Sequence, residues 1–319
     1  EVLAWASNIG VTEITPNLVG ELQAVGTPPA AHVPSDPFFT NGQLWGLKQI
    51  QAPAAWNFNN GSNDLIAAIL DEGVDYNHED LAANVWDKSQ AEVELGRPLL
   101  TQVGAHGFDD ADVDPEVMPQ DPGRVPFLGN AGPQSPNPSQ SLWQVHGTAV
   151  AGVLGAVSNT TGVVGVAQNC KLYSAKVVGD RAGAYAPGWF TWGSFCAAVD
   201  RICRLKTLDN QPFVVVNASF RFPDWGGTPW WDATCIQELE NAGILFVAAA
   251  GNQGYTAWSS TAANVITVGA SDTRDFKCPY SNDGDIYAPG ASIVSTWSGY
   301  AADTPYNAVY RVPEKSRGG

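Results

Sequence analysis

The sequence is poor in basic residues: its 319 residues include 16 Lys and Arg against 32 Asp and Glu, a net charge of −16 at pH 7. A nucleic-acid-binding protein needs a basic surface to contact phosphates, so this balance excludes that class. Charged residues make up only 15% of the chain and hydrophobic residues 44%, which excludes a disordered or coiled-coil protein. The composition therefore indicates a globular protein with a large packed core.

Long apolar runs and metal-binding cysteine motifs are also missing. The longest nearly unbroken apolar run, Ala242 to Gly251, is about half as long as a helix that crosses a bilayer. We therefore expect no membrane span. The five cysteines show no Cys-x-x-Cys or Cys/His spacing that would hold zinc. Their odd number leaves at least one thiol free or paired outside this chain.

What the sequence has in abundance is Trp, Pro and Gly, at 12, 22 and 33 residues. These residues indicate a rigid molecule that is rich in loops. Together with scarce lysine and an isoelectric point near 4.4, they favour a secreted or extracellular protein over a cytosolic one.

Apolar runs of strand length alternate along the chain with segments of helical spacing. Runs that are apolar on both faces belong in a buried parallel sheet. The alternation predicts an α/β fold with a doubly wound, mostly parallel sheet flanked by helices. The expected strands are Leu65–Leu70, Lys171–Val178, Phe213–Val216, Ile244–Ala250 and Val265–Gly269, and the expected helices are Gly147–Val157, Ser194–Leu205 and Trp231–Asn241.

Two segments depart from this alternation. Residues 1–36 lack sustained periodicity and become rich in Pro and Ala, which indicates an N-terminal extension, a propeptide remnant or a linker before a domain over residues 37–319. The segment Gly107–Trp143 is crowded with Asp, Pro, Gly and Ser, and we expect a long irregular surface loop there.

Three polar residues stand where an α/β sheet gathers its functional groups, at the carboxyl ends of strands. Asp71 ends the first apolar run, His146 opens a helix of small residues, and Asn252 follows the fourth apolar run. In isolation each has an ordinary explanation: a solvated turn aspartate, a satisfied polar histidine and a strand running into a turn.

The three polar residues stand in three sequence blocks, which read D-E-G-V-D-Y-N-H-E-D-L from Asp71, H-G-T-A-V-A-G from His146 and A-A-A-G-N up to Asn252. In this order the blocks resemble the subtilisin family of serine proteases. The resemblance implies a subtilisin-like fold in which Asp71 orients the imidazole, His146 is the general base and Asn252 donates to the oxyanion. It also implies that Ser219 and Gly251 lie along the substrate cleft.

The chain departs from the family pattern at two places. Glu72 replaces the Thr, Ser or Asp that is common beside the catalytic aspartate, and Phe220-Arg221-Phe222 replaces the usual Leu-Gly-Gly. The second change affects a strand that pairs with the peptide, so the resemblance does not predict substrate preference.

The nucleophile of the family stands in a Gly-Thr-Ser-Met-Ala-like block that opens a central helix after an Ala-Pro-Gly element. This sequence has the element at Ala288–Gly290 and reads on to Gly319 without the block. If Gly319 is the glycine of the block, the nucleophile would be the second residue beyond it, close to His146. We therefore expect that the C-terminal part is missing, that a second polypeptide supplies it or the sequence is cut short, and that this chain alone is inactive.

The resemblance further implies a Ca2+ cofactor, held by a loop whose alternate carbonyls and one Asn amide oxygen point inward. Ca2+ takes six to eight oxygen ligands, which suits such a loop with added carboxylates, whereas an ordinary turn is the alternative. A second acidic cluster resembles the run before the catalytic histidine of kexin-like members; a solvated acidic loop is its alternative. The implied ligands are Asp36, Asp80, Val157, Asn159, Thr161 and Val163 for the first site, and Asp109, Asp114 and Glu116 for the second.

The sequence thus predicts a secreted serine endopeptidase that cleaves protein or peptide substrates through an acyl-enzyme. A catalytically inactive structural or binding subunit that keeps the scaffold is the alternative. A relative that transfers the acyl group to an amine instead of water is a third hypothesis.

Overall fold

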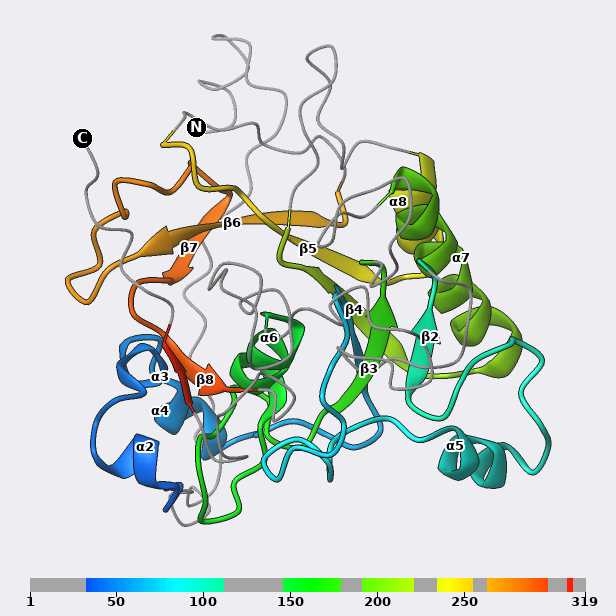
Figure 1. The fold of residues 1–319 in the computed structure, drawn as a ribbon, viewed down its shortest axis with the longest axis horizontal. Coiled ribbons are helices and arrows are strands. Elements are labelled where there is room, and N and C mark those ends of the chain that lie inside the picture. The colour runs from blue at the N-terminus through cyan, green and yellow to red at the C-terminus, as the bar shows by residue number, and fades with distance from the viewer. Residues whose placement is uncertain are drawn as a thin grey trace, which may run out of the picture.

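The computed structural model describes residues 33–111, 146–178, 191–220, 234–254, 263–297 and 309–311. Its centre is a seven-stranded sheet with the strand order β2-β3-β1-β4-β5-β6-β7 (Figure 1). Every pair of neighbours is parallel. The strands are β1 Ile66–Asp71, β2 Gly107–Asp109, β3 Lys171–Lys176, β4 Phe213–Ala218, β5 Leu245–Ala249, β6 Val265–Ser271 and β7 Ile286–Pro289.

Helices cover both faces of the sheet. In Figure 1, α7 and α8 lie on one side and α6, α3 and α4 on the other. Beside them, β8 (Val294–Thr296) pairs with β9 (Val309–Arg311) as an antiparallel ribbon. Within the described ranges, no helix combines the length and apolarity that crossing a bilayer requires. The helices are α2 Pro37–Thr40, α3 Trp45–Gln49, α4 Ala52–Trp56, α5 Lys88–Leu95, α6 His146–Gly155, α7 Trp192–Asp209 and α8 Thr234–Asn241.

The interior strand β1 is buried at every position because it contributes to a core on each face. Leu70 packs in the cluster that includes Phe195 of α7 and Ile236 of α8. Ile69 packs in the opposite cluster, which includes Ala151 of α6 and Leu47 of α3. Alternate side chains of one strand thus serve two cores, which explains the unbroken apolar run. The predicted doubly wound α/β fold is confirmed.

All five predicted strands and all three predicted helices are present, and their described ends lie within a few residues of the predicted ones. Residues 231–233, the predicted start of the third helix, lie outside the described residues. The prediction of an irregular loop from Gly107 onward was wrong at its start, because Gly107–Asp109 forms the buried strand β2. Gly107 permits this pairing: a Cβ there would meet the Ser174 carbonyl oxygen at 1.8 Å. A three-residue strand is too short to show periodicity, so the sequence carried no signal for it.

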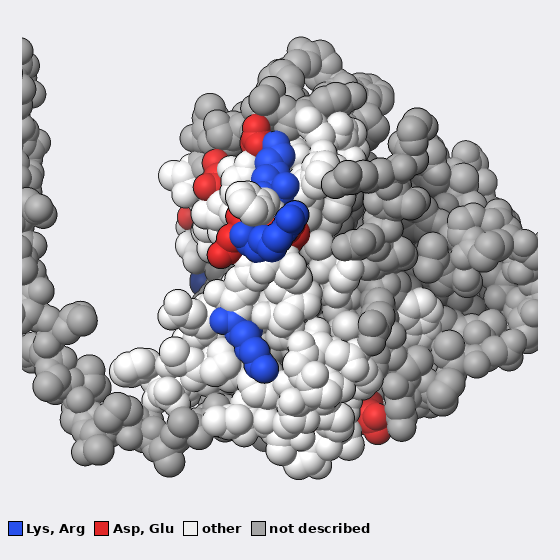
Figure 2. All heavy atoms as spheres, turned by 90° about the vertical axis from the view of Figure 1, so that its left-hand side faces the viewer, with Lys and Arg blue, Asp and Glu red and all other residues white. Residues whose placement is uncertain are grey.

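The face seen in Figure 2 is largely uncharged over its described surface, and the basic side chains near its top lie beside acidic ones. The connection between β6 and β7 contains two such pairs, Arg274 with Asp272 and Lys277 with Asp283. On this face, paired charges do not form the basic patch that binding phosphates would require.

Candidate active site

The predicted site residues gather at one edge of the sheet. Strands β1, β4 and β5 are parallel neighbours, so their carboxyl ends meet at the same edge. Asp71 is the last residue of β1, Ser219 follows β4, and Gly251 and Asn252 follow β5. His146 joins them as the first residue of α6, which packs beside β1.

Asp71 and His146 are in direct contact. The imidazole Nδ1 lies 2.9 Å from each carboxylate oxygen of Asp71. The aspartate side chain is only 5% exposed, whereas the histidine side chain is 45% exposed. Because Nδ1 is held by the carboxylate, Nε2 is the ring nitrogen that can exchange a proton with a reacting group. The pair therefore has the geometry of a general base with an orienting acid.

The contact depends on glycine at the second position of α6. A Cβ at Gly147 would lie 2.2 Å from the carbonyl oxygen of Gly73 and 3.0 Å from the Asp71 Cβ. Thr148, which is fully buried, accepts a hydrogen bond from the Asp75 backbone N–H at its Oγ1. The small residues at the start of α6 thus let the helix press against the end of β1.

The ribbon strand β8 anchors the same helix from another side. The Ser295 hydroxyl donates to the Ala149 carbonyl and the Thr296 hydroxyl to the Thr148 carbonyl, each at 2.6 Å. A Cβ at Gly152 would lie 2.3 Å from the Thr296 Oγ1, so this contact also requires glycine. Helix α6 is therefore fixed between β1 and β8, and His146 is fixed with it.

Glu72 plays a larger part than its departure from the family pattern indicated. Its side chain is buried and its Oε1 accepts a hydrogen bond from the His146 backbone N–H. Burial first, and then the negative charge of Asp71, raise the pKa of Glu72 well above its ordinary value. A carboxyl group at a helix N-terminus satisfies an N–H group that has no partner within the helix. Glu72 thus holds the first turn of the helix that carries the histidine.

The pKa of His146 rises from its ordinary 6.5 to about 9. The charge of Asp71 is the largest cause, the hydrogen bond to Asp71 and the charge of Glu72 add to it, and burial opposes it. The two carboxyl groups therefore favour the imidazolium. A charged imidazole is the form that a general base reaches after it takes a proton, so this environment stabilises the product of the proton transfer.

Asn252 and Gly251 belong to a turn that Asn282 supports. Gly251 has a φ of 102°, a conformation that favours glycine, and its carbonyl accepts from the Asn282 backbone N–H at 2.9 Å. The Asn282 side chain donates to the Ala250 carbonyl and accepts from the Gln253 N–H. Asn252 itself is exposed. No local sequence pattern indicated Asn282, because its role depends on contacts between distant segments.

Ser219 lies immediately after β4, and its hydroxyl accepts from the Asn217 side-chain amide at 2.9 Å. Phe220 packs against the core cluster of α7 and α8. Arg221 and Phe222, the other two departures from the family pattern, lie outside the described residues.

The first group of predicted calcium ligands is brought together. Asp36 and Asp80 are almost completely buried. Asp36 accepts from the Ser158 hydroxyl and the Asn159 N–H, while Asp80 accepts from the Asn159 amide, the Thr161 hydroxyl and the Val163 N–H. The Asp80 carbonyl accepts from the Val157 N–H.

This loop has a donor set that fits a calcium ion. A Cβ at Gly162 would lie 2.0 Å from the Asp80 Oδ2, so the loop closes on the carboxylate. In the part of the chain that the structure describes, no Lys or Arg pairs with Asp36 or Asp80. Two buried carboxylates without a countercharge, beside oxygen atoms of one loop, match the hard ligands that Ca2+ prefers.

The second group of predicted ligands is not brought together in the described residues. Asp109 forms a buried ion pair with Lys176, with Nζ and Oδ2 2.9 Å apart. Asp114 and Glu116 lie outside the described ranges. Among the residues described, no group of three or more His, Cys, Asp or Glu side chains gathers as a metal site. Asp109 therefore already has a countercharge in this structure.

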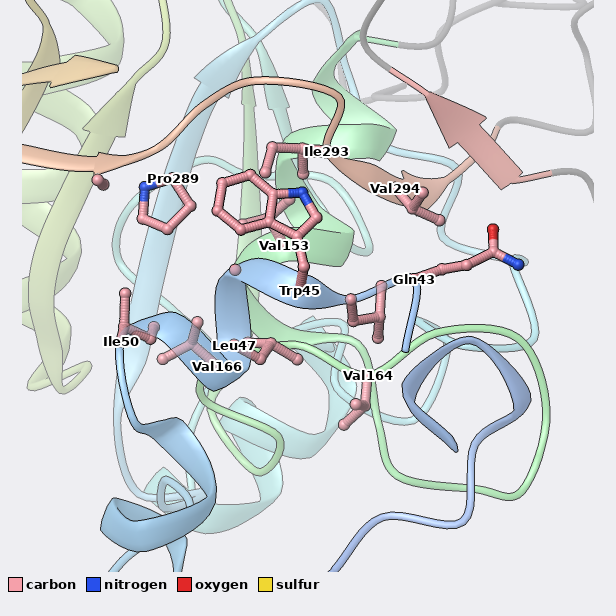
Figure 3. A pocket seen from close by; sticks show the side chains of 13 residues that line it. Gln43, Trp45, Leu47, Ile50, Val153, Val164, Val166, Pro289, Ile293 and Val294 are labelled. Carbon is pink, nitrogen blue, oxygen red and sulfur yellow. The ribbon is translucent and has the colours of Figure 1, made fainter. Parts of the chain in front are cut away.

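An apolar pocket of about 160 Å3 lies apart from these residues (Figure 3). The indole of Trp45 rises from α3 between Pro289 and Val153. None of the predicted catalytic or substrate-binding residues lines this pocket, so we do not assign it to the candidate site. It is lined by Gln43, Leu44, Trp45, Gly46, Leu47, Ile50, Val153, Val164, Val166, Ala288, Pro289, Ile293 and Val294.

Comparison with known proteins agrees with this geometry, since the model of the subtilase family matches residues 62–313. The chain belongs to the subtilase family. It is 31% identical over 293 residues to thermitase from Thermoactinomyces vulgaris, covering 87% of this chain and 83% of thermitase. It is 31% identical over 265 residues to Subtilisin BL from Lederbergia lenta, covering 80% of this chain and 74% of that protein.

The solved structure of a cold-adapted subtilisin-like serine proteinase shares the fold. Its TM-score is 0.50 at 22% identity, covering 81% of this chain and 72% of the other. The resemblance found in the sequence is thereby confirmed, and this subtilase carries its Asp71–His146 contact on a subtilisin-like sheet.

The close packing at Gly147 gives a first prediction. Gly147→Ala forces the Gly73 carbonyl to move, and we expect it to lower the free energy of unfolding by roughly 1–3 kcal/mol and to displace His146. Denaturant titration and the histidine NMR signals measure both effects. Gly193→Ala in α7 is the matched control, because its Cβ would meet its nearest neighbour at 3.6 Å. Equal stability of the two variants would show that α6 does not approach β1 so closely.

The electrostatics of the pair give a second prediction. NMR titration should show His146 protonated up to about pH 9. Since this pKa lies above the ordinary 6.5, the pair stabilises the fold fully below about pH 6.5 and loses that stabilisation as pH rises through about 9. Asp71→Asn should lower the pKa of His146, because it removes the largest cause of the rise, and Glu72→Gln should lower it less. If Asp71→Asn left the titration curve of His146 unchanged, that result would contradict the contact between the two side chains.

Proposed function

We propose that this subtilase supplies the general base of a serine endopeptidase that hydrolyses peptide bonds through an acyl-enzyme. The observation that supports this most is the 2.9 Å contact between the His146 Nδ1 and the buried carboxylate of Asp71. Family membership agrees with the reaction class. The proposed substrates are proteins or peptides.

In the proposed reaction, His146 acts in its neutral form, whose population grows as pH rises towards the pKa of about 9. Its Nε2 atom takes the proton of a serine hydroxyl as the oxygen attacks the peptide carbonyl. Asp71 keeps the imidazole in the orientation that exposes Nε2 and stabilises the imidazolium. His146 then gives the proton to the leaving amine, and a water molecule releases the acyl group by the same route. The amide of Asn252 donates to the oxyanion of the tetrahedral intermediate. Ser219 and Gly251 contact the peptide beside it.

The serine of this proposal is not among the residues that contact His146. Within the described ranges, no serine hydroxyl hydrogen-bonds to the imidazole, and the sequence has no Gly-Thr-Ser block. We therefore assign the nucleophile to a segment that this sequence does not contain, either continuous with it or a second polypeptide. The 319 residues alone are then inactive.

The alternative function is a structural or binding subunit that keeps the scaffold without catalysis. The lack of a serine beside His146 in the described residues favours it. The glycine packing that holds His146 on Asp71 favours the enzyme, because a binding subunit has no need of an oriented imidazole.

A fluorophosphonate probe distinguishes the two functions in the protein as its host produces it. The probe reacts with a serine that a base activates, so we expect one labelled serine peptide and hydrolysis of a denatured protein substrate. His146→Ala should abolish both, and Asn252→Ala should lower kcat by about 100- to 1000-fold, as the loss of such a donor does in a subtilisin. Asn282→Asp removes the side-chain donor to the Ala250 carbonyl, so it tests whether activity requires this support of the turn that carries Asn252. A folded protein without labelling or hydrolysis would support the binding subunit.

We also propose that Asp36, Asp80 and Asn159, with the carbonyls of Val157, Thr161 and Val163, hold a calcium ion. When bound, the ion would neutralise the two buried carboxylates and hold the loop 157–163 against the start of the domain. A site of this kind suits a secreted protein, since calcium is plentiful outside cells, and the acidic composition agrees with that location. Asp109, Asp114 and Glu116 remain the proposed ligands of a second site.

Removal of calcium should expose the unbalanced carboxylates. We expect EDTA to lower the melting temperature by about 5 °C or more, and added Ca2+ to restore it. Asp80→Asn should remove this dependence on calcium, whereas Asp64→Asn, at an exposed position before β1, should keep it. A melting temperature that is the same with EDTA and with millimolar Ca2+ would contradict the site.

A further inference from the structure

Two of the five cysteines meet between the helices that cover one face of the sheet. Cys196 lies in the second turn of α7 and Cys235 is the second residue of α8. Their Sγ atoms are 2.9 Å apart, although the residues are 39 positions apart in the sequence. Both side chains are thiols in this structure. The packing of α7 on α8 therefore holds the two sulfur atoms together.

The other cysteines have no comparable neighbour. Cys203 lies on α7 two turns after Cys196, and within the described residues its thiol forms no hydrogen bond with a second sulfur. Cys170, at the start of β3, donates to backbone carbonyls. Cys278 is buried in the β6–β7 connection. The structure thus selects one pair among the ten that five cysteines allow.

We propose that Cys196 and Cys235 form a disulfide that ties α7 to α8 when the protein meets a small-molecule disulfide such as oxidised glutathione. The Cys196 thiolate attacks one sulfur of that molecule, forms a mixed disulfide and expels one thiolate. The Cys235 thiolate then attacks the Cys196 sulfur and expels the second. One S–S bond breaks and one forms, the two cysteines lose two protons and two electrons, and the small-molecule disulfide is reduced to two thiols.

Exposure and charge agree with this order of attack. Cys196 is partly exposed, so a reagent can reach it, whereas Cys235 is buried. The hydrogen bond with Cys235 lowers the pKa of Cys196, against the effects of burial and of Glu238. Burial raises the pKa of Cys203 to about 12. Cys196 is therefore the thiol of the three that most readily becomes the attacking thiolate.

The disulfide would close a chain segment that contains β4. Strand β4 lies between β1 and β5 and is followed directly by Ser219, so the closed segment includes one of the strands whose ends form the candidate site. Because Cys196 and Cys235 are 39 positions apart in the sequence, a disulfide between them would restrict the conformations of the unfolded chain and so stabilise the folded one. The disulfide leaves Cys170, Cys203 and Cys278 as thiols. The odd number of cysteines in the chain therefore needs no disulfide to a partner molecule.

Thiol counting on the folded chain tests the proposal. The protein is equilibrated with oxidised glutathione at pH 8, unfolded, alkylated and mapped by mass spectrometry. We expect three alkylated cysteines, a peptide that joins Cys196 to Cys235, and a melting temperature about 5 °C higher that dithiothreitol lowers again. Cys203→Ser should behave like the parent chain. Cys196→Ser should keep all four remaining thiols, whereas Cys235→Ser should hold glutathione on Cys196 and form no internal disulfide.

Three outcomes would overturn the proposal. Five alkylated cysteines after equilibration would show that the pair does not oxidise. A peptide that joins Cys203 to Cys235 would show that the helices pack in another register. Glutathione that stays attached to Cys196 while Cys235 is alkylated would show that the second sulfur is out of reach. Because the test follows thiols and stability, it is independent of the proposed protease activity.

Discussion

The close approach of α6 to the end of β1 is the constraint on which the candidate site depends. Gly147 has no room for a side chain beside the Gly73 carbonyl, and this missing side chain is what brings the imidazole of His146 to 2.9 Å from Asp71. The rest of the helix supports this position, since β8 donates two hydrogen bonds to carbonyls of its first turn. The position of His146 in the site thus depends first on backbone packing, and charge has its effect on residues that this packing has already placed.

Buried carboxyl groups determine the electrostatics of the site that this packing forms. Asp71 and Glu72 are two buried carboxyl groups at the end of one strand, and they would repel each other if both were ionised. The imidazolium of His146 relieves that repulsion, and the burial of Glu72 favours its neutral form. The same principle applies at the loop 157–163, where Asp36 and Asp80 are buried with N–H and hydroxyl donors as their neighbours. In both places the fold buries carboxyl groups where a cation can bind to them or a proton can neutralise them.

The sequence predicted the parts of the structure that repeat over several residues. The five strands were visible because each is apolar on both faces, and the meeting of Asp71 and Asn252 at one sheet edge followed from parallel strands. Strand β2 could not be predicted, because its three residues carry no period and pair only with β3. The contacts of Glu72 with α6, of Asn282 with the Gly251 turn and of Asp109 with Lys176 each join segments that are distant in sequence. Such contacts leave no local pattern, so only the fold reveals them.

This subtilase holds His146 on Asp71 at the edge of the sheet to which Asn252 also belongs. A crystal structure of the chain measures this most directly. It should show the His146 Nδ1 at about 3 Å from the Asp71 carboxylate, with the side chain of Asn252 on the same edge. An imidazole more than about 10 Å from Asp71, or an Asn252 directed to the opposite end of the strands, would contradict the account.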